Sequence, residues 1–418
     1  MKLLRGSLWL IVVLLVLQVI KVLLSRQVAA SASLAGQIIG CGQFLLVLGT
    51  VFVLLFAFLF RRYFGSRNPF VAGTLFFLGL AACLELLMAW WMHNPGSIPS
   101  GLRASYAYYY DYYEEDLLQF DPRYAVYNSD LFYTLKPDTS FTFQNIEYKN
   151  VVRTNGLGLR DHDSSLRSPR IACIGDSYTM GWGVGQDDCY PARLRSLMGG
   201  GVINMGVPSY GTARELINLG RIDVSRLRWV ILQYCSNDAS ENETAAENHY
   251  KLPISSRAEY DRLVRSSAVS GTYFPGKYFL TITNLYWKSL VNKIHPFFNL
   301  RWDRTDGLLK QEEQARVFLD LLAHSAIDFK KVGVVVTMMD DYENMNDVFL
   351  RTVKRLSSEA PYREIFGSGL KVLDIAPLLD KDDFYILDIH YKPKGYEKIA
   401  RAIRDCIGDS VMAGDAVR

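Results

Sequence analysis

A serine and a histidine far apart in the chain are the residues whose settings most favour chemistry. Ser177 closes the sequence Ile-Gly-Asp-Ser, which follows a short apolar run and leads into a glycine-rich stretch. The carboxyl end of a parallel strand is where α/β enzymes place reactive groups. His390 stands two residues after Asp388, directly before the last predicted helix. Serine, histidine and an acid are the components of a nucleophile, its general base and the group that orients the base.

The elements that must position these residues alternate between short apolar strands and helical patterns. We predict strands at residues 170–174, 202–205, 229–233, 332–338 and 371–375, and a last amphipathic helix at 393–407. Such alternation predicts a parallel sheet that is covered by helices on both faces. Gly206 follows the second strand and Asn237 follows the third, while Asp388 and His390 follow the fifth. All of these residues therefore belong to one edge of the predicted sheet, where ligands of such folds bind.

Three long apolar runs precede this region, at residues 3–24, 38–60 and 70–92. Each has about the 20 residues that span a bilayer as a helix. A buried core helix is the alternative for any one run, but three in succession favour a multi-pass membrane anchor. Basic residues before the first run and between the second and third predict that these ends face the cytoplasm. The rest of the chain is then expected outside the cytoplasmic (inner) membrane, in the periplasm or the extracellular space, whether or not the first run is cleaved as a signal.

These features divide the chain into three parts. Residues 1–94 form the predicted anchor, 95–144 a tyrosine-rich and strand-containing lead-in, and 145–418 the domain with the sheet. The tyrosines suit either a membrane–water interface or a helix that packs on the folded domain. An insertion at about 239–331 is first polar and then aromatic. We interpret it as a lid over the site, with a packed helical subdomain as the alternative.

Composition excludes several classes of function. The net charge of +3 gives no reason to expect a nucleic-acid partner. The six cysteines include no Cys-x-x-Cys pair, so neither a zinc site nor thioredoxin-type chemistry is expected, and we predict no metal and no cofactor. Cys173 and Cys235 fall within predicted strands and are expected to be buried thiols. Disulfide pairing stays open.

The ordered set of Ser177, Gly206, Asn237 and His390 resembles the four positions that name the SGNH (GDSL-type) hydrolase superfamily. The stretches at 153–161 and 181–184 are similar to a membrane-anchored bacterial branch. The resemblance covers about residues 145–238 and 332–407. It implies a three-layer α/β/α, flavodoxin-like domain with a parallel sheet.

The resemblance also implies a role for each residue. Ser177 is the expected nucleophile, His390 its base and later the acid, and Asp388 the group that orients the imidazole. The oxyanion hole is expected to consist of the backbone N–H groups of Ser177 and Gly206 and the side-chain amide of Asn237.

The leading hypothesis is a membrane-anchored serine esterase that acts through an acyl-serine and removes small acyl groups from an envelope glycan or lipid. The first alternative is an O-acyltransferase, for example one that acetylates a cell-surface polysaccharide together with a membrane acyl-donor partner. The two share their catalytic residues and differ in whether water or a hydroxyl resolves the acyl-enzyme. The second alternative, a non-catalytic binding or assembly subunit, is disfavoured because Ser177 and His390 are both present.

Overall fold

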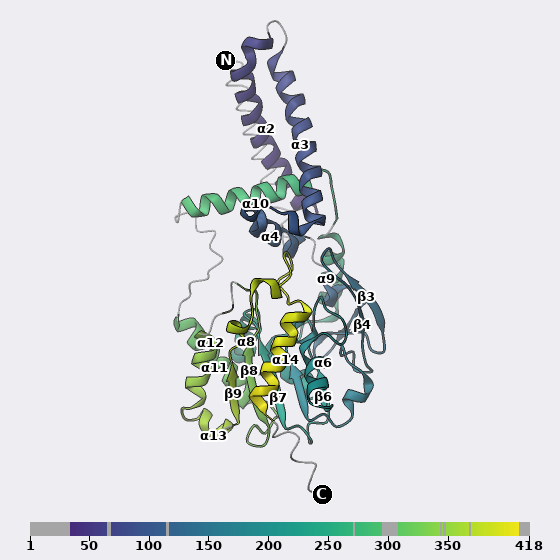
Figure 1. The fold of residues 1–418 in the computed structure, drawn as a ribbon, viewed down its shortest axis with the longest axis vertical. Coiled ribbons are helices and arrows are strands. Elements are labelled where there is room, and N and C mark those ends of the chain that lie inside the picture. Colours follow the sequence, from purple (N-terminus) through teal and green to yellow (C-terminus); the bar gives the residue numbers. More distant parts are fainter. Residues whose placement is uncertain are drawn as a thin grey trace. The chain divides into compact units, whose positions relative to one another are not determined.

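The computed structural model describes residues 34–64, 68–113, 117–270, 272–294, 308–342, 345, 348–367 and 369–408 (Figure 1). The predicted first span, residues 3–24, lies outside the described residues. The chain divides into two compact units. The first comprises Met1–Asp116 and Leu263–Leu300, and the second comprises Leu117–Arg262 and Arg301–Arg418.

Two long apolar helices, α2 (Leu34–Phe64) and α3 (Pro69–His93), pack against each other in the first unit. Both are long and apolar enough to cross a membrane, in the windows Gln37–Phe60 and Pro69–His93. Only 11% and 17% of these windows are buried, whereas a core helix would be largely covered. Two helices of the described part, rather than the three expected from the whole sequence, are therefore candidate spans.

Shorter helices of the described part of the first unit lie beside this pair. The 3-10 turns Pro95–Ser97 and Ser100–Leu102 lead into α4 (Arg103–Tyr113), and α10 (Lys277–Ile294) contacts α2, α3 and α4. Helix α4 contains most of the tyrosine-rich stretch, and Tyr106, Tyr109 and Tyr110 are buried. The Tyr106 hydroxyl donates to the Met88 carbonyl oxygen at 3.2 Å. These tyrosines are thus packed inside the first unit.

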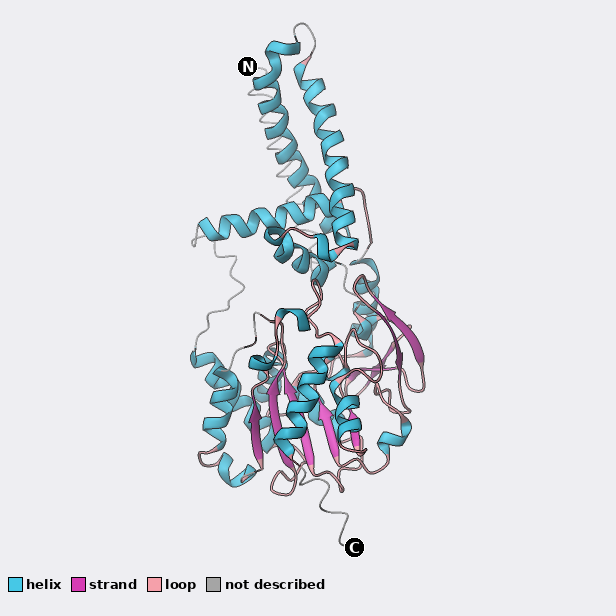
Figure 2. Cartoon of the chain, in the orientation of Figure 1, coloured by secondary structure: helices cyan, strands magenta, loops and turns pink. Residues whose placement is uncertain are grey.

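A five-stranded parallel sheet forms the centre of the second unit (Figure 2). Its strands are β5 (Ile171–Ile174), β6 (Val202–Asn204), β7 (Trp229–Tyr234), β8 (Gly333–Met338) and β9 (Leu370–Leu373). They are arranged in the order β6-β5-β7-β8-β9, which is the 2-1-3-4-5 order of a doubly wound sheet. The five predicted strands are confirmed to within about two residues.

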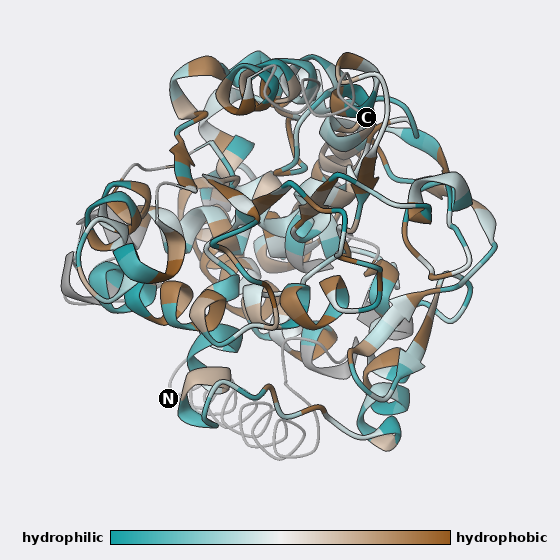
Figure 3. Cartoon of the chain, turned by 90° about the horizontal axis from the view of Figure 1, so that it is seen from below, coloured by the Kyte–Doolittle hydropathy of each residue, from teal (hydrophilic) through white to brown (hydrophobic). Residues whose placement is uncertain are grey.

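The helices around this sheet form two packed groups. Helices α6 (Tyr190–Leu197) and α14 (Pro393–Ile407) contact each other and lie in front of the strands in Figure 1. A second group contains α7 (Thr212–Leu219), α8 (Asp238–Glu247), α11 (Leu308–Ala323) and α12 (Val348–Ser357). Helices of this unit mix hydrophobic and hydrophilic residues, as coverage of a sheet requires (Figure 3). Cys173 and Cys235 are buried as predicted, and none of the six cysteines, all of which are described, forms a disulfide.

Two antiparallel hairpins precede the sheet. The first pairs β1 (Ala125–Asn128) with β2 (Phe132–Leu135), and the second pairs β3 (Ser140–Gln144) with β4 (Lys149–Arg153). The second hairpin shares a buried cluster with the loop after β5, through Phe143, Tyr148, Val152 and Trp182. This contact connects the lead-in to the segment that follows Ser177. The remaining described helices are the one-turn α5 (Ser177–Met180), α9 (Arg257–Ser270), α13 (Tyr362–Phe366) and four short 3-10 turns, Leu118–Phe120, Asp163–Leu166, Ala376–Leu378 and Lys381–Asp383.

Candidate active site

Ser177 is the first residue of a one-turn helix, α5 (Ser177–Met180), at the carboxyl end of β5. Asp176 caps this turn, since its Oδ1 atom accepts the Tyr178 N–H at 2.9 Å. Gly175 is required by close packing, because a Cβ atom there would lie 2.1 Å from the Thr179 hydroxyl oxygen. The turn is therefore tightly held, while Ser177 itself stays partly exposed. An accessible hydroxyl on a rigid turn suits a nucleophile.

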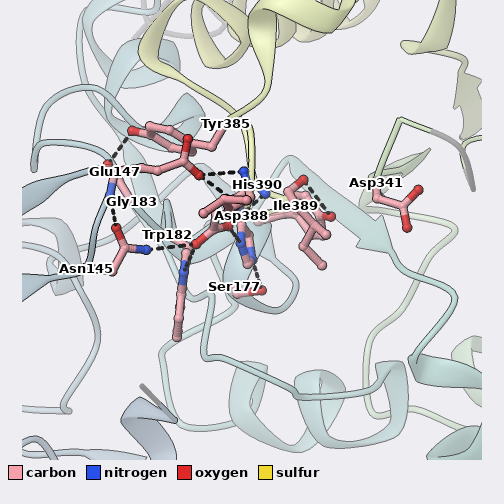
Figure 4. Close-up of polar contacts among 12 residues, drawn as sticks. Asn145, Glu147, Ser177, Trp182, Gly183, Asp341, Tyr385, Asp388, Ile389 and His390 are labelled. Carbon is pink, nitrogen blue, oxygen red and sulfur yellow. Dashed lines mark hydrogen bonds and ion pairs between the residues drawn. The ribbon is translucent and has the colours of Figure 1, made fainter. Parts of the chain in front are cut away.

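His390 joins Ser177 to Asp388 by two short hydrogen bonds (Figure 4). Its Nε2 atom lies 2.7 Å from the Ser177 hydroxyl oxygen, and its Nδ1 atom lies 2.5 Å from Asp388 Oδ1. With a proton on Nδ1, the imidazole donates to Asp388, and Nε2 is left to accept the serine proton. Residues 213 positions apart in the chain are thus joined in the arrangement that a serine nucleophile, its general base and the orienting acid require.

Asp388 has a second set of hydrogen bonds that the sequence did not indicate. Three side chains donate to its Oδ2 atom, namely Tyr148 at 2.9 Å, Trp182 at 3.1 Å and Asn145 at 3.2 Å. Burial acts to raise the pKa of Asp388, but the charge and hydrogen bonds of His390 and the Tyr148 hydroxyl outweigh it, and the pKa is lowered. The carboxylate is therefore ionised and able to stabilise the imidazolium that forms during reaction.

The indole of Trp182 also orients the histidine directly. Its ring lies stacked on the His390 imidazole, with ring centroids 5.2 Å apart and planes inclined by 21°. Trp182 lies between Gly181 and Gly183 in the glycine-rich stretch after Ser177. An aromatic residue at that place in the sequence is the feature from which this contact could have been predicted.

Glu147, at the tip of the β3–β4 hairpin, holds the loop that carries the acid and the base. Its carboxylate accepts the backbone N–H groups of Ile386, Leu387 and Asp388 at 2.7, 2.8 and 2.9 Å. Burial raises the pKa of Glu147, against the opposing effect of these three donors. Glu147 thus acts as a positioning residue, and nothing in its sequence setting distinguished it from a solvated turn.

Replacing Glu147 with alanine is expected to lower kcat about 10- to 100-fold, because hydrogen bonds to a charged acceptor contribute about 1.5–3 kcal/mol. The KM of a small ester should change little, since Glu147 acts through the loop at Asp388. Glu147→Gln keeps one acceptor oxygen, so its kcat should fall less than that of the alanine variant. Steady-state kinetics with p-nitrophenyl acetate test this, with exposed Glu247→Gln as the matched control. An unchanged kcat in the alanine variant would show that the loop holds its position unaided.

The stretch at 153–161, at the start of the domain with the sheet, contacts the segments around the same site. Arg160 is fully buried and donates to the carbonyl oxygens of Met180, Gly181 and Val184, which surround the glycine-rich loop. Asp161 accepts the Asn204 backbone N–H at 2.8 Å. This motif therefore fixes the segments that follow β5 and β6 rather than contributing a reactive group.

The other two predicted site residues also lie against α5. Gly206 packs so closely that a Cβ atom would lie 2.1 Å from the Met180 nitrogen, but its own N–H donates to Asn204 Oδ1 at 3.0 Å. The exposed Asn237 donates from Nδ2 to Asp176 Oδ2 at 3.3 Å. Gly206 must release Asn204 before its N–H can bind an oxyanion. The three-donor oxyanion hole therefore stays a prediction.

Two further acids, Glu215 and Asp238, are buried in α7 and at the start of α8. Thr212 donates to Asp238 Oδ2 at 2.9 Å, whereas neither carboxyl oxygen of Glu215 has a hydrogen-bond partner among the described residues. Burial, together with the mutual repulsion of these acids, raises the pKa of Glu215 well above its usual 4.5. Glu215 is therefore expected to be neutral in the folded protein.

Glu215→Gln is expected to stabilise the protein relative to wild type as the pH rises. Because the pKa of Glu215 is raised in the folded protein, its contribution to the free energy of unfolding is fully present below pH 4.5. Wild type loses this contribution as the pH rises through the folded-state pKa. The glutamine variant has no such loss, and each pKa unit corresponds to about 1.4 kcal/mol. Urea unfolding at several pH values measures the difference, with exposed Glu364→Gln as control. A difference that is independent of pH contradicts a buried neutral Glu215.

Metal ligands do not gather at this site. Within the described part of the chain, no group of three or more histidine, cysteine or acidic side chains could hold a metal ion. The chemistry derived above uses only the side chains of the chain itself.

Comparison with known proteins gives one structural neighbour to describe. No family model matches the chain, and no curated protein matches it. A solved structure described as a lipolytic protein of the G-D-S-L family from Desulfitobacterium hafniense DCB-2 is 14% identical and covers 56% of this chain and 98% of its own. Its TM-score of 0.28 is too low to establish a common fold. The functional assignment therefore depends on the geometry of the site.

Proposed function

We propose that this chain is a serine hydrolase of the SGNH type that cleaves carboxylic esters through an acyl-serine. The observation that carries the proposal is the hydrogen-bonded series Ser177, His390 and Asp388 at the carboxyl edge of a doubly wound parallel sheet. His390 Nε2 removes the hydroxyl proton as the Ser177 oxygen attacks the ester carbonyl. The imidazolium then protonates the departing alcohol, and water enters to release the acid.

Negative charge develops on the carbonyl oxygen during both steps, and hydrogen-bond donors beside Ser177 would stabilise it. In the described part of the chain no acceptor meets the Ser177 N–H. The Asn237 amide donates to the carboxylate of Asp176, the residue before Ser177. We propose these two donors for the oxyanion, with Gly206 as a third once its N–H leaves Asn204.

The proposed setting is the outer side of a cytoplasmic membrane. Helices α2 and α3 are long and apolar enough to cross a bilayer. Arg61 and Arg62 follow the apolar window of α2 in its last turn, and Arg67 follows in the sequence before α3, so all three belong to the short stretch between the two windows. The positive-inside rule places that stretch in the cytoplasm and the sheet outside. Substrates on that side include acylated envelope glycans and lipids, and we propose a small acyl group such as acetyl.

Labelling with a fluorophosphonate tests the nucleophile. The full-length protein in nanodiscs is treated with the probe, and the adduct is located by peptide mass spectrometry. An adduct on Ser177 that is absent from Ser177→Ala supports the proposal. Labelling of another serine, or equal labelling of the variant, overturns it.

A further inference from the structure

Helix α10 is attached to one end of the α2–α3 pair by specific polar contacts. Glu85 of α3 is 8% exposed, and its carboxylate accepts the Tyr273 hydroxyl at 3.0 Å and the Phe279 backbone N–H at 2.7 Å. Thr281 of α10 lies 3.4 Å from Cys41 of α2, between the hydroxyl oxygen and the sulfur. The first turns of α10 are therefore fixed where α2 begins and α3 ends.

The two halves of α10 differ in exposure. Its first half is covered by the neighbouring helices, with Tyr278, Phe279, Leu280 and Ile282 buried. In its second half, Tyr286, Trp287, Lys288 and Ser289 are consecutive and exposed, and Leu285 and Leu290 on either side of them are half-buried. Trp287 is 59% exposed. Figure 1 shows that α10 runs across α2 and α3, rather than along them, and continues past them.

The composition of α10 fits a lipid surface. The sequence of the helix has no acidic residue, and Lys288 is exposed in its second half, whereas Lys277 is buried. Exposed tryptophan and tyrosine beside lysine are typical of membrane–water interfaces, where aromatic rings sit among headgroups and cations meet phosphates. An exposed tryptophan in contact with water alone leaves a large apolar surface uncovered.

Exposed aromatic residues near the two ends of the α2–α3 pair indicate the level of the membrane–water interface. Trp90, near the end of α3 and one turn or so beyond Glu85, is 52% exposed, and Tyr63 is 80% exposed at the opposite end of the α2–α3 pair. The helix from Pro69 to Trp90 is about 30 Å long at roughly 1.5 Å per residue. This length matches the roughly 30 Å hydrocarbon core of a bilayer. Glu85 lies five residues before Trp90, or about 7.5 Å along the helix at roughly 1.5 Å per residue. Its contacts therefore hold the first turns of α10 about one to two helical turns from Trp90, a depth like the roughly 5–10 Å at which interfacial helices lie.

We propose that the exposed half of α10, from Leu285 to Leu290, lies in the headgroup layer of the membrane as an in-plane helix. A helix that crosses the ends of two spanning helices runs parallel to the bilayer surface. The aromatic part of the insertion then contacts lipid and fixes the depth and rotation of the α2–α3 pair. This role differs from the lid that the sequence favoured, and it does not depend on Ser177 chemistry.

Site-specific photo-crosslinking tests this placement. p-Benzoylphenylalanine is introduced singly at Tyr286, Trp287 or Leu86 in the full-length protein, which is reconstituted in nanodiscs of phosphatidylethanolamine and phosphatidylglycerol. Leu86 is 72% exposed on α3 and is the positive control for lipid contact, and Tyr342, 44% exposed in the second unit, is the negative control. Adducts are identified by mass spectrometry after irradiation.

Phospholipid adducts at Tyr286 or Trp287, together with adducts at Leu86, are the expected result. Adducts at Leu86 with none at either α10 position would overturn the proposal. Crosslinks from α10 to a second copy or to the second unit would overturn it as well, by showing a protein partner for this surface. Absence of lipid at all positions removes the bilayer from this unit and the proposal with it, whereas fluorophosphonate labelling of Ser177 is unaffected.

Discussion

Replacing Ser177 with alanine is expected to reduce ester turnover by a factor on the order of 10⁴ or more. The reason is that the Ser177 hydroxyl is the one partner of His390 Nε2 in the hydrogen-bonded series, so the variant has no atom to accept the acyl group. KM for a small ester should change little, because the surrounding donors remain. The free energy of unfolding should also change little, since Ser177 is partly exposed and its hydroxyl has His390 as its one hydrogen-bond partner among the described residues.

The measurement is steady-state hydrolysis of p-nitrophenyl acetate by full-length wild type, Ser177→Ala and Ser236→Ala. Ser236 is an exposed serine at the end of β7 and serves as the matched control. His390→Ala should lose a comparable factor, and the double variant should be no slower than either single one, because the residues act as a unit. Additive losses, or substantial activity in Ser177→Ala, would assign the reaction to another residue.

The sheet and the convergence of Ser177, His390 and Asp388 were predictable because each depends on short-range sequence pattern. Apolar runs of four to seven residues that alternate with amphipathic helices determine the strands, and the structure confirms all five. Ser177 and His390 could be assigned to one sheet edge because the carboxyl ends of parallel strands meet there. The short distances that join His390 to its neighbours follow from that topology.

The supports of the site were not predictable, because they depend on how a separate hairpin packs. Tyr148 and Glu147 belong to a turn whose sequence resembles any polar connection, and only tertiary contact brings them to Asp388. The N–H of Gly206 was assigned to an oxyanion, although in the structure it donates to Asn204. The packing of the insertion against α3 and α4 was also not predictable, because it depends on tertiary contacts. Tyr273 donates to Glu85 of α3, and the Tyr278 ring contacts the Tyr109 ring of α4.

Asp388→Asn is expected to lower kcat by about 10³- to 10⁴-fold while the serine and histidine remain in place. The amide has one acceptor oxygen, whereas Asp388 accepts on both atoms. If that oxygen faces His390, the NH₂ group points at the Tyr148 and Trp182 donors, which then lose their acceptor. If it faces those donors, the NH₂ group points at His390 Nδ1 and favours the tautomer in which Nε2 holds the proton and cannot accept one.

The same substitution should remove a pH-dependent part of the stability. The pKa of Asp388 is lower in the folded protein than its usual 3.8, so the carboxylate stabilises the fold above that pH and loses this effect as the pH falls through the folded-state pKa. The stability advantage of wild type over Asp388→Asn, measured by urea unfolding, should therefore shrink on acidification below about pH 3.8. Exposed Asp382→Asn in the neighbouring turn is the matched control and should change neither kcat nor this difference. An Asp388→Asn enzyme that keeps wild-type kcat would mean that Trp182 stacking alone orients His390, and the acid would then be a structural group rather than part of the catalytic series.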